Sequence, residues 1–143
     1  MIRALLDVNV LIALLDADHA SHRTALAWFS EHATGGWASC PITENGCVRI
    51  MSHPGYPNAH SVVEVVERLR AAAAHAAHQF WPDGLSLLDE RLIDPTRVHG
   101  PRQLTDVYLL ALAVKNGGRL VTFNASIALA AVTGATRQHL LQL

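Results

Sequence analysis

The sequence is short of cysteine and has no long hydrophobic run. Its two cysteines, Cys40 and Cys47, form neither a CxxC pair nor a disulfide framework, so we expect a reduced, cytoplasmic protein with two small buried thiols. The apolar stretch at 4–15 is interrupted by Asp7 and Asn9, and it is too short to span a bilayer. No small-residue cleavage site follows it. We therefore interpret it as a core strand running into a helix, and not as a signal peptide.

The chain also lacks a surplus of positive charge. Eleven Lys and Arg residues face twelve Asp and Glu residues, which gives a formal net charge of −1. Proteins that bind nucleic acid usually carry a basic surplus, so the total charge does not indicate RNA, although the local arrangement of charges matters more. Lys115 is the only lysine, and arginine suits phosphate partners better than lysine does. The mean hydropathy of +0.20 leaves two explanations open, a large core or an apolar patch for a partner.

Strand-like and helix-like segments alternate along the chain. Short apolar runs predict strands, and apolar residues at helical spacing predict helices. The strands are expected at 2–6, 37–40, 80–81, 119–123 and 139–143, and the helices at 10–15, 20–32, 61–75 and 126–131, with two more starting at Thr43 and Thr105. This alternation predicts an α/β protein of one domain over 1–143, with a mainly parallel central sheet covered by helices on both faces.

Four polar residues stand where predicted elements change. Asp7 and Asn124 follow strands, whereas Glu44 and Asp106 open helices. The carboxyl ends of parallel strands and the helix starts after them line one edge of such a sheet, and ligands bind there. We therefore expect these four side chains to meet at that edge.

Each of these acids has an ordinary explanation when it is taken alone. Acidic residues are favoured in the first turn of a helix, and Thr43 and Thr105 fit the sequence pattern of helix N-caps. Asp7 is harder to explain in this way because it lies between two strongly apolar runs. A buried carboxylate needs a partner, such as a metal, an arginine or backbone donors.

Converging carboxylates repel one another and are best tolerated around a cation. Ligand sets made only of oxygen atoms favour Mg²⁺ or Mn²⁺ over Zn²⁺. Such an ion can activate water and neutralise the charge of a phosphodiester. The predicted metal ligands Asp7, Glu44, Asp106 and Asn124 therefore indicate phosphoryl chemistry.

The chain resembles the PIN domains of VapC-type toxins. The resemblance is carried in order by LLDVNVLIALLD (residues 5–16), ITENGCVRIMSHP (42–54), FWPDGLSLLD (80–89) and RQLTDVYLLALAVKNGGRLVTFN (102–124), and it covers nearly the whole length. It implies that Asp7, Glu44 and Asp106 are the catalytic acids that bind the metal. It also implies that Asn9 and Thr105 are the polar residues that accompany them.

The resemblance further implies a toxin of a type II toxin–antitoxin system. Such an enzyme would be an Mg²⁺- or Mn²⁺-dependent endoribonuclease that cleaves RNA with a metal-activated water and is neutralised by a VapB-type antitoxin. A homodimer is expected, with a groove for the antitoxin among the N-terminal helices and the helix at 61–75. An antitoxin Arg or Lys is expected to insert near the acids and to compete with the metal.

One position departs from the family pattern. Many relatives carry an aspartate where this chain has Asn124, and asparagine brings an oxygen ligand without charge. We expect the change Asn124→Asp to strengthen metal binding. A catalytically weak or inactive module that binds RNA or protein therefore remains the alternative function.

Several other residues could form part of the site. Arg102 precedes Asp106 by four residues and could hold phosphate or pair with the carboxylates, while an ion pair is favoured for Arg49. The nine histidines lack a third ligand at zinc spacing and are interpreted as structural or solvent-facing. Asp83 is interpreted as a turn residue.

Two other enzyme classes share part of the pattern. Nucleases that act on flap or structured DNA also use acid clusters, but this chain is too short for their extra DNA-gripping segments. Phosphatases of the haloacid dehalogenase type require a DxD motif after the first strand, where this chain reads Asp7-Val8-Asn9.

Overall fold

The computed structural model describes residues 2–143 and contains one parallel sheet. Its strands lie in the order β3-β2-β1-β4-β5, and every neighbouring pair is parallel. They are β1 (Ala4–Leu6), β2 (Trp37–Ser39), β3 (His78–Phe80), β4 (Arg119–Thr122) and β5 (Leu140–Gln142). The three inner strands are almost completely buried, as the continuous apolar runs predict for strands covered on both faces.

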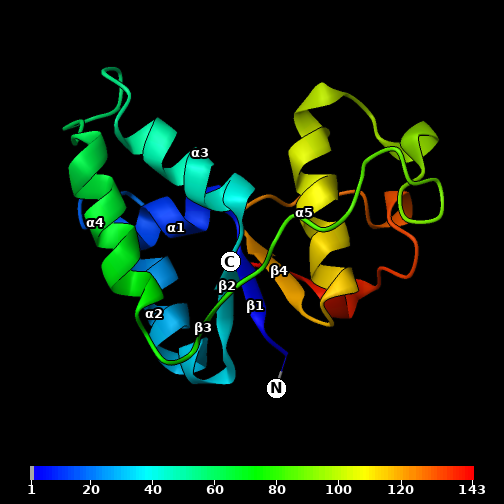
Figure 1. Cartoon of the computed structure of the whole chain (residues 1–143), viewed down its shortest axis with the longest axis horizontal. Helices are drawn as coiled ribbons and strands as arrows, with labels where there is room; N and C mark the ends of the chain where they lie inside the picture. The colour runs from blue at the N-terminus through cyan, green and yellow to red at the C-terminus, as the bar shows by residue number, and fades with distance from the viewer. Residues whose placement is uncertain (1) are drawn as a thin grey trace.

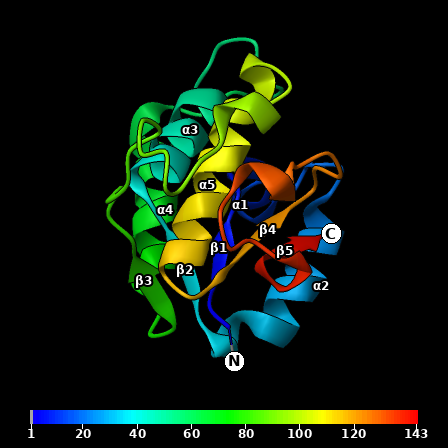
Figure 2. The ribbon, with the colours of Figure 1, turned by 90° about the vertical axis from the view of Figure 1, so that its right-hand side faces the viewer.

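Helices cover both faces of this sheet (Figure 1). On one face lie α1 (Val8–Leu15), α2 (His22–His32), α3 (Pro41–Met51) and α4 (Val62–Ala73), and on the other lies α5 (Leu104–Lys115). Figure 2, seen from the α5 side, shows this helix in front of β1 and β4 with the last segment of the chain beside it. The fold class predicted from the alternating segments is therefore confirmed.

The two faces have different cores. One cluster packs the side chains of α1, α3 and α4 against β1 and β2, and includes Trp37, Cys47 and Met51. The other is built around α5, whose residues 107–113 are all buried. Both cysteines are free and buried, as predicted. Within residues 2–143, no helix is long and apolar enough to cross a membrane.

Some predicted boundaries and caps are wrong. The helix α3 begins at Pro41 with Cys40 as its N-cap, and Thr43 lies inside the first turn, where its hydroxyl accepts the Cys40 N–H at 3.0 Å. The helix α5 begins at Leu104, so Thr105 is its second residue and not its cap. In place of the helix expected at 126–131, the structure has a single 3-10 turn, η4 (Leu129–Ala131). Because proline is favoured at the first helical position, α3 begins two residues earlier than predicted. Because a 3-10 turn leads into α5, that helix begins one residue earlier.

The start of α3 lies tightly against the start of α1. A Cβ added at Gly46 would approach the Val8 side chain to 2.8 Å, closer than packed atoms tolerate. Gly46 therefore lets α3 approach the end of β1, where Asp7 lies. This contact places the first turn of α3 and the beginning of α1 at the same edge of the sheet.

Candidate active site

Asp7 is held firmly at the end of the central strand. It is the N-cap of α1, and its Oδ1 accepts the Val8 N–H at 2.7 Å. Its Oδ2 accepts the Thr122 hydroxyl at 2.7 Å from the neighbouring strand β4. Only 6% of the residue is exposed. Burial raises the pKa of Asp7, the charge of Asp106 raises it further, and the hydrogen bonds from Thr122 and Val8 oppose the rise.

Asp106 and Asn124 complete a cluster with Asp7. Asp106 lies in the first turn of α5, and its Oδ2 accepts the Asn124 side-chain N–H at 2.7 Å. The Asn124 side-chain oxygen accepts the Ser126 N–H at 2.9 Å, so the amide presents its nitrogen to Asp106. Asn124 therefore relieves the negative charge of Asp106 with a hydrogen bond, where an aspartate would add a second charge.

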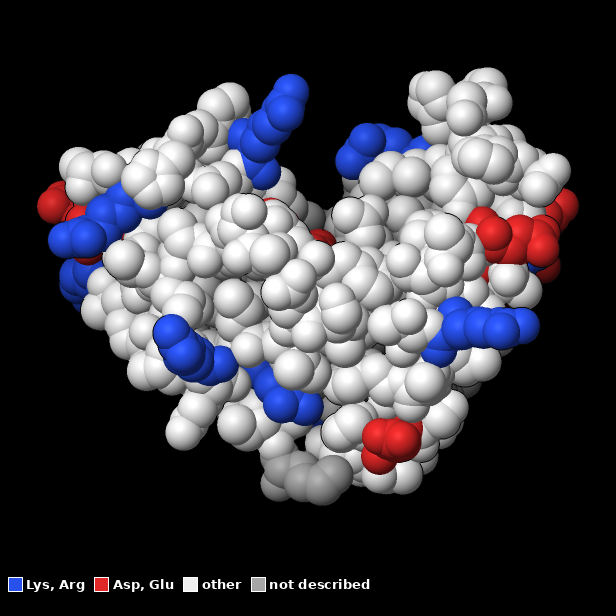
Figure 3. All heavy atoms as spheres, turned by 180° about the vertical axis from the view of Figure 1, so that it is seen from behind, with Lys and Arg blue, Asp and Glu red and all other residues white. Residues whose placement is uncertain are grey.

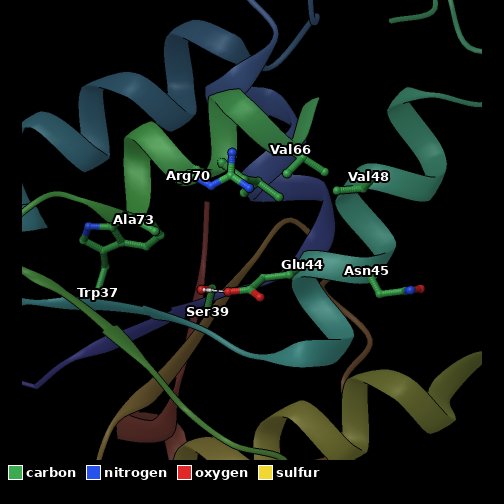
Figure 4. A pocket seen from close by; sticks show the side chains of 9 residues that line it. Trp37, Ser39, Glu44, Asn45, Val48, Val66, Arg70 and Ala73 are labelled. Atoms are coloured by element: carbon green, nitrogen blue, oxygen red, sulfur yellow. Dashed lines mark hydrogen bonds between the residues drawn. The ribbon is translucent and has the colours of Figure 1, made fainter. Parts of the chain in front are cut away.

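Glu44 faces away from this cluster. Its Oε2 accepts the Ser39 hydroxyl at 2.6 Å, and the Nε2 of His78 lies 2.8 Å from the same Ser39 oxygen. Figure 4 shows Glu44 directed toward Ser39 in a pocket between α3 and α4. The structure thus brings together Asp7, Asp106 and Asn124 but not Glu44, and the role of Glu44 as a metal ligand stays a prediction.

The supporting residues lie around the same edge. Asn9 is exposed in the first turn of α1, and Arg102 is exposed in the 3-10 turn η3 (Pro101–Gln103) that leads into α5. Thr105 lines a pocket of about 400 Å³ together with Arg49 and Asp83. Figure 3 shows the molecule hollowed at one edge, with acidic atoms inside the hollow and basic side chains on both sides of it.

Asp83 is a polar residue of this edge that the sequence interpretation assigned only to a turn. Its Oδ1 is buried and has no hydrogen-bond partner among the described residues. Burial raises the pKa of Asp83; a hydrogen bond with Cys40 opposes this, and the charge of Glu44 adds to it. Its position shortly after the third strand, from which Trp81 and Pro82 separate it, was the signal that could have found it.

The donor set around Asp7 fits a hard divalent cation. Two carboxylates and an amide meet there, and the pKa of Asp7 is raised first by burial and further by the charge of Asp106. Within residues 2–143, no group of three or more His, Cys, Asp or Glu side chains could hold a metal ion as arranged. Mg²⁺ is commonly bound by one or two carboxylates together with water and substrate phosphates, so the pair of Asp7 and Asp106 is sufficient.

The histidines do not form a site in the described chain. His22 and His32 use their Nδ1 atoms on the backbone oxygens of Ala13 and Trp28, at 2.7 and 2.9 Å. These contacts agree with the structural role expected for them.

Known proteins resemble this chain in sequence and in fold. The sequence matches the family model of the PIN domain over residues 4–132. It is 55% identical over 141 residues to Ribonuclease VapC44 of Mycobacterium tuberculosis, covering 99% of each chain. It is 43% identical over 132 residues to Ribonuclease VapC39 of the same organism, covering 92% of this chain and 95% of the relative.

Two solved structures share the fold at low sequence identity. Mycobacterium tuberculosis VapC20, a toxin that cleaves the sarcin-ricin loop, matches with a TM-score of 0.56 at 13% identity, over 86% of this chain and 89% of that one. VapBC2 from Rickettsia felis, bound to a DNA fragment from its promoter, matches with a TM-score of 0.55 at 12% identity, over 85% and 88%.

Proposed function

This chain belongs to the PIN-domain family, in its VapC branch, and we propose that it is an Mg²⁺- or Mn²⁺-dependent endoribonuclease toxin neutralised by a VapB-type antitoxin. The observation that carries the proposal is the pair of Asp7 and Asp106 at the carboxyl edge of the sheet. Burial and the neighbouring charge both raise the pKa of Asp7. A carboxylate kept in such surroundings is typical of a functional site.

Asp7 and Asp106 are positioned by different parts of the fold. Thr122 and the Val8 N–H fix both oxygens of Asp7, so this carboxylate cannot rotate freely. Asp106 lies in the first turn of α5, which covers the other face of the sheet from α1, and its charge acts on Asp7. A bound Mg²⁺ or Mn²⁺ would supply activation of water and neutralisation of phosphate charge there.

Arginine side chains at the rim would hold the RNA backbone. Arg49 on α3 and Arg102 on η3 are exposed, and no carboxylate among the described residues forms an ion pair with either. A guanidinium binds phosphate with two parallel hydrogen bonds, which gives position as well as affinity. Two exposed arginines beside the site could therefore bind phosphate even though the chain as a whole has a net charge of −1.

Cleavage of a mixed RNA pool tests the proposal. We expect fragments with Mg²⁺ or Mn²⁺, none after EDTA, and none from the Asp7→Ala variant. The alternative is a catalytically weak PIN module, and the bond from Asn124 to Asp106 is the observation that favours it. Absence of metal-dependent cleavage in both the chain and its Asn124→Asp variant would establish that alternative.

The antitoxin and a second copy of the chain are the proposed protein partners. The pocket of about 430 Å³ between α3 and α4 is lined by apolar side chains together with Glu44 and Arg70, which suits an antitoxin segment that combines apolar and charged side chains. Val62 and Val63 on α4 are exposed and add apolar surface nearby. A complex in which the bound antitoxin lay far from the acid edge would contradict this mode of inhibition, and sedimentation would test the proposed homodimer.

A further inference from the structure

Glu44 ends a chain of hydrogen bonds that begins on another strand. Ser39, the last residue of β2, donates its hydroxyl hydrogen to Glu44. A serine has only one such hydrogen, so the hydrogen between Ser39 and His78 must come from the Nε2 of His78. The direction is therefore fixed as His78 to Ser39 to Glu44. Such a chain presents a donor to the carboxylate and fixes its position.

The first two members of this chain are rigidly placed. Ser39 is 2% exposed, within a strand paired on both sides. The ring of His78 lies against Trp37, with 4.4 Å between ring centroids, and β2 and β3 pair in register at these residues. The hydroxyl that Glu44 meets is thus fixed by two strands, whereas Glu44 itself has a flexible side chain on a half-exposed helical turn.

The electrostatic surroundings separate Glu44 from the other acids. The charge that raises the pKa of Asp7 is that of Asp106. The charge of Glu44 acts instead on His78 and Asp83, on the other side of β1. Figure 4 shows that Arg70 of α4 also lines the pocket into which Glu44 points. Glu44 therefore lies beside the Ser39 donor, Arg70 and Asp83, and its charge is not among the causes that shift the pKa of Asp7.

We infer that Ser39 and His78 are positioning residues that hold the Glu44 carboxylate away from Asp7 and Asp106. The inference rests on the proposed metal-dependent function. To reach a cation at the acid pair, Glu44 would have to rotate its side chain, because the close packing of Gly46 against Val8 fixes the start of α3. That rotation breaks the bond to Ser39, so the bond and the metal compete for one carboxylate. The competition weakens metal binding.

Mn²⁺ binding to the purified, metal-free full chain tests this competition. The signal of free Mn²⁺ in electron paramagnetic resonance gives the affinity without any need for activity. We expect Ser39→Ala to bind Mn²⁺ about tenfold more tightly, because a tenfold change corresponds to about 1.4 kcal/mol, within the range of one hydrogen bond to a charged group. His78→Phe keeps a ring beside Trp37 but removes the donor, and it should act in the same direction by a smaller factor.

Matched variants separate positioning from a general loss of structure. His78→Gln retains an N–H donor and should restore the affinity of the unaltered chain. Ser52→Ala removes another hydroxyl from the end of α3, one that bonds to the Val48 carbonyl, and should leave Mn²⁺ affinity unchanged. In the Glu44→Gln background, Ser39→Ala should change the affinity less than about twofold, because neighbours in one network couple and the coupling requires Glu44. A purely structural defect would weaken binding, which is the opposite sign.

The possible results decide between the proposals. Tighter binding by Ser39→Ala that disappears in the Glu44→Gln background supports the inference. Unchanged or weaker binding overturns it, while the proposed function survives if the unaltered chain still binds Mn²⁺ and Asp7→Asn does not. If no variant and no unaltered chain binds Mn²⁺, both the metal centre and this inference are wrong.

Discussion

The two ends of α1 carry buried aspartates whose pKa values are shifted in opposite directions. Asp7 caps the beginning of the helix with 6% exposure, and Asp16 caps its end with 8% exposure. The pKa of Asp7 is raised, whereas that of Asp16 is lowered. Both are affected first by burial, which raises a carboxyl pKa, so the difference lies in their partners.

Asp16 is surrounded by donors and potential cations. Its burial is outweighed by hydrogen bonds from the Tyr56 hydroxyl and the Asp18 N–H, and by the histidines His60 and His19. Asp7 receives two hydrogen bonds but faces the like charge of Asp106. The hydrogen bond from Tyr56 to Asp16 anchors the loop after α3, whereas the like charge of Asp106 beside Asp7 suits a cation. Because Asp7 and Asp16 are almost equally buried, it is their partners that distinguish them.

The largest expected difference is in catalysis. We expect Asp7→Asn to lower RNA cleavage by at least about a hundredfold, because metal ions contribute several kcal/mol to the transition state and this change removes a proposed ligand. Asp16→Asn should keep the rate within about twofold, since Asp16 lies at the far end of the helix. Initial rates on one labelled RNA, at equal Mn²⁺ and protein concentration, measure both. Equal losses in the two variants would contradict the different roles of Asp7 and Asp16.

The next effect concerns the charge at the acid pair. We expect Asn124→Asp to bind Mn²⁺ about tenfold more tightly, because a third carboxylate replaces an amide that now donates to Asp106. The same change should lower the thermal stability of the metal-free chain, since the hydrogen bond becomes a repulsion. Titration of Mn²⁺ and thermal unfolding without metal test the two halves. Asn124→Ala serves as the control, and equal affinities for the Asn and Asp forms would contradict the prediction.

A smaller effect is expected at the structural aspartate. Tyr56→Phe should lower the free energy of unfolding at neutral pH by about 1–2 kcal/mol, the size of a hydrogen bond to a charged group. The folded pKa of Asp16 is lowered, so its contribution is present above the unfolded value of 3.8 and is lost as the pH falls through the folded value. Urea unfolding of both forms from pH 7 to pH 3 checks this. A difference that grew toward low pH would refute it.

The smallest expected effect is a gain of stability on substitution of Asp7, in contrast to the loss expected for Tyr56→Phe. In metal-free protein, Asp7→Asn should raise the melting temperature by a few degrees, the shift that about 1 kcal/mol gives in a domain of this size. The folded pKa of Asp7 is raised, so its carboxyl favours the folded state below the unfolded value and disfavours it as the pH rises through the folded value. The gain from Asn should therefore appear on going to neutral pH. A variant less stable than the unaltered chain at pH 7 would show that Asp7 is structurally compensated.

Much of the fold follows from local sequence. The continuous apolar runs predicted the strands at 2–6 and 119–123, and their burial on both faces predicted parallel pairing. Helix starts and short turns depend on more than the local pattern of apolar residues. A proline decides where the first hydrogen bonds of α3 form, and a preceding 3-10 turn does so for α5. The segment at 129–131 forms only the 3-10 turn η4 instead of the predicted helix. The sequence gives no direct measure of these choices.

The sequence by itself determined that Asp7 would lie at the end of a buried core strand, because apolar residues flank it on both sides. Only the tertiary structure decided which partner each polar side chain would meet. Glu44 meets Ser39 and His78, Asn124 meets Asp106, and Asp83 keeps an unpartnered buried oxygen. The physical reason is that burial follows from the summed hydrophobicity of a segment, whereas the direction of a hydrogen bond follows from distances between residues far apart in the chain.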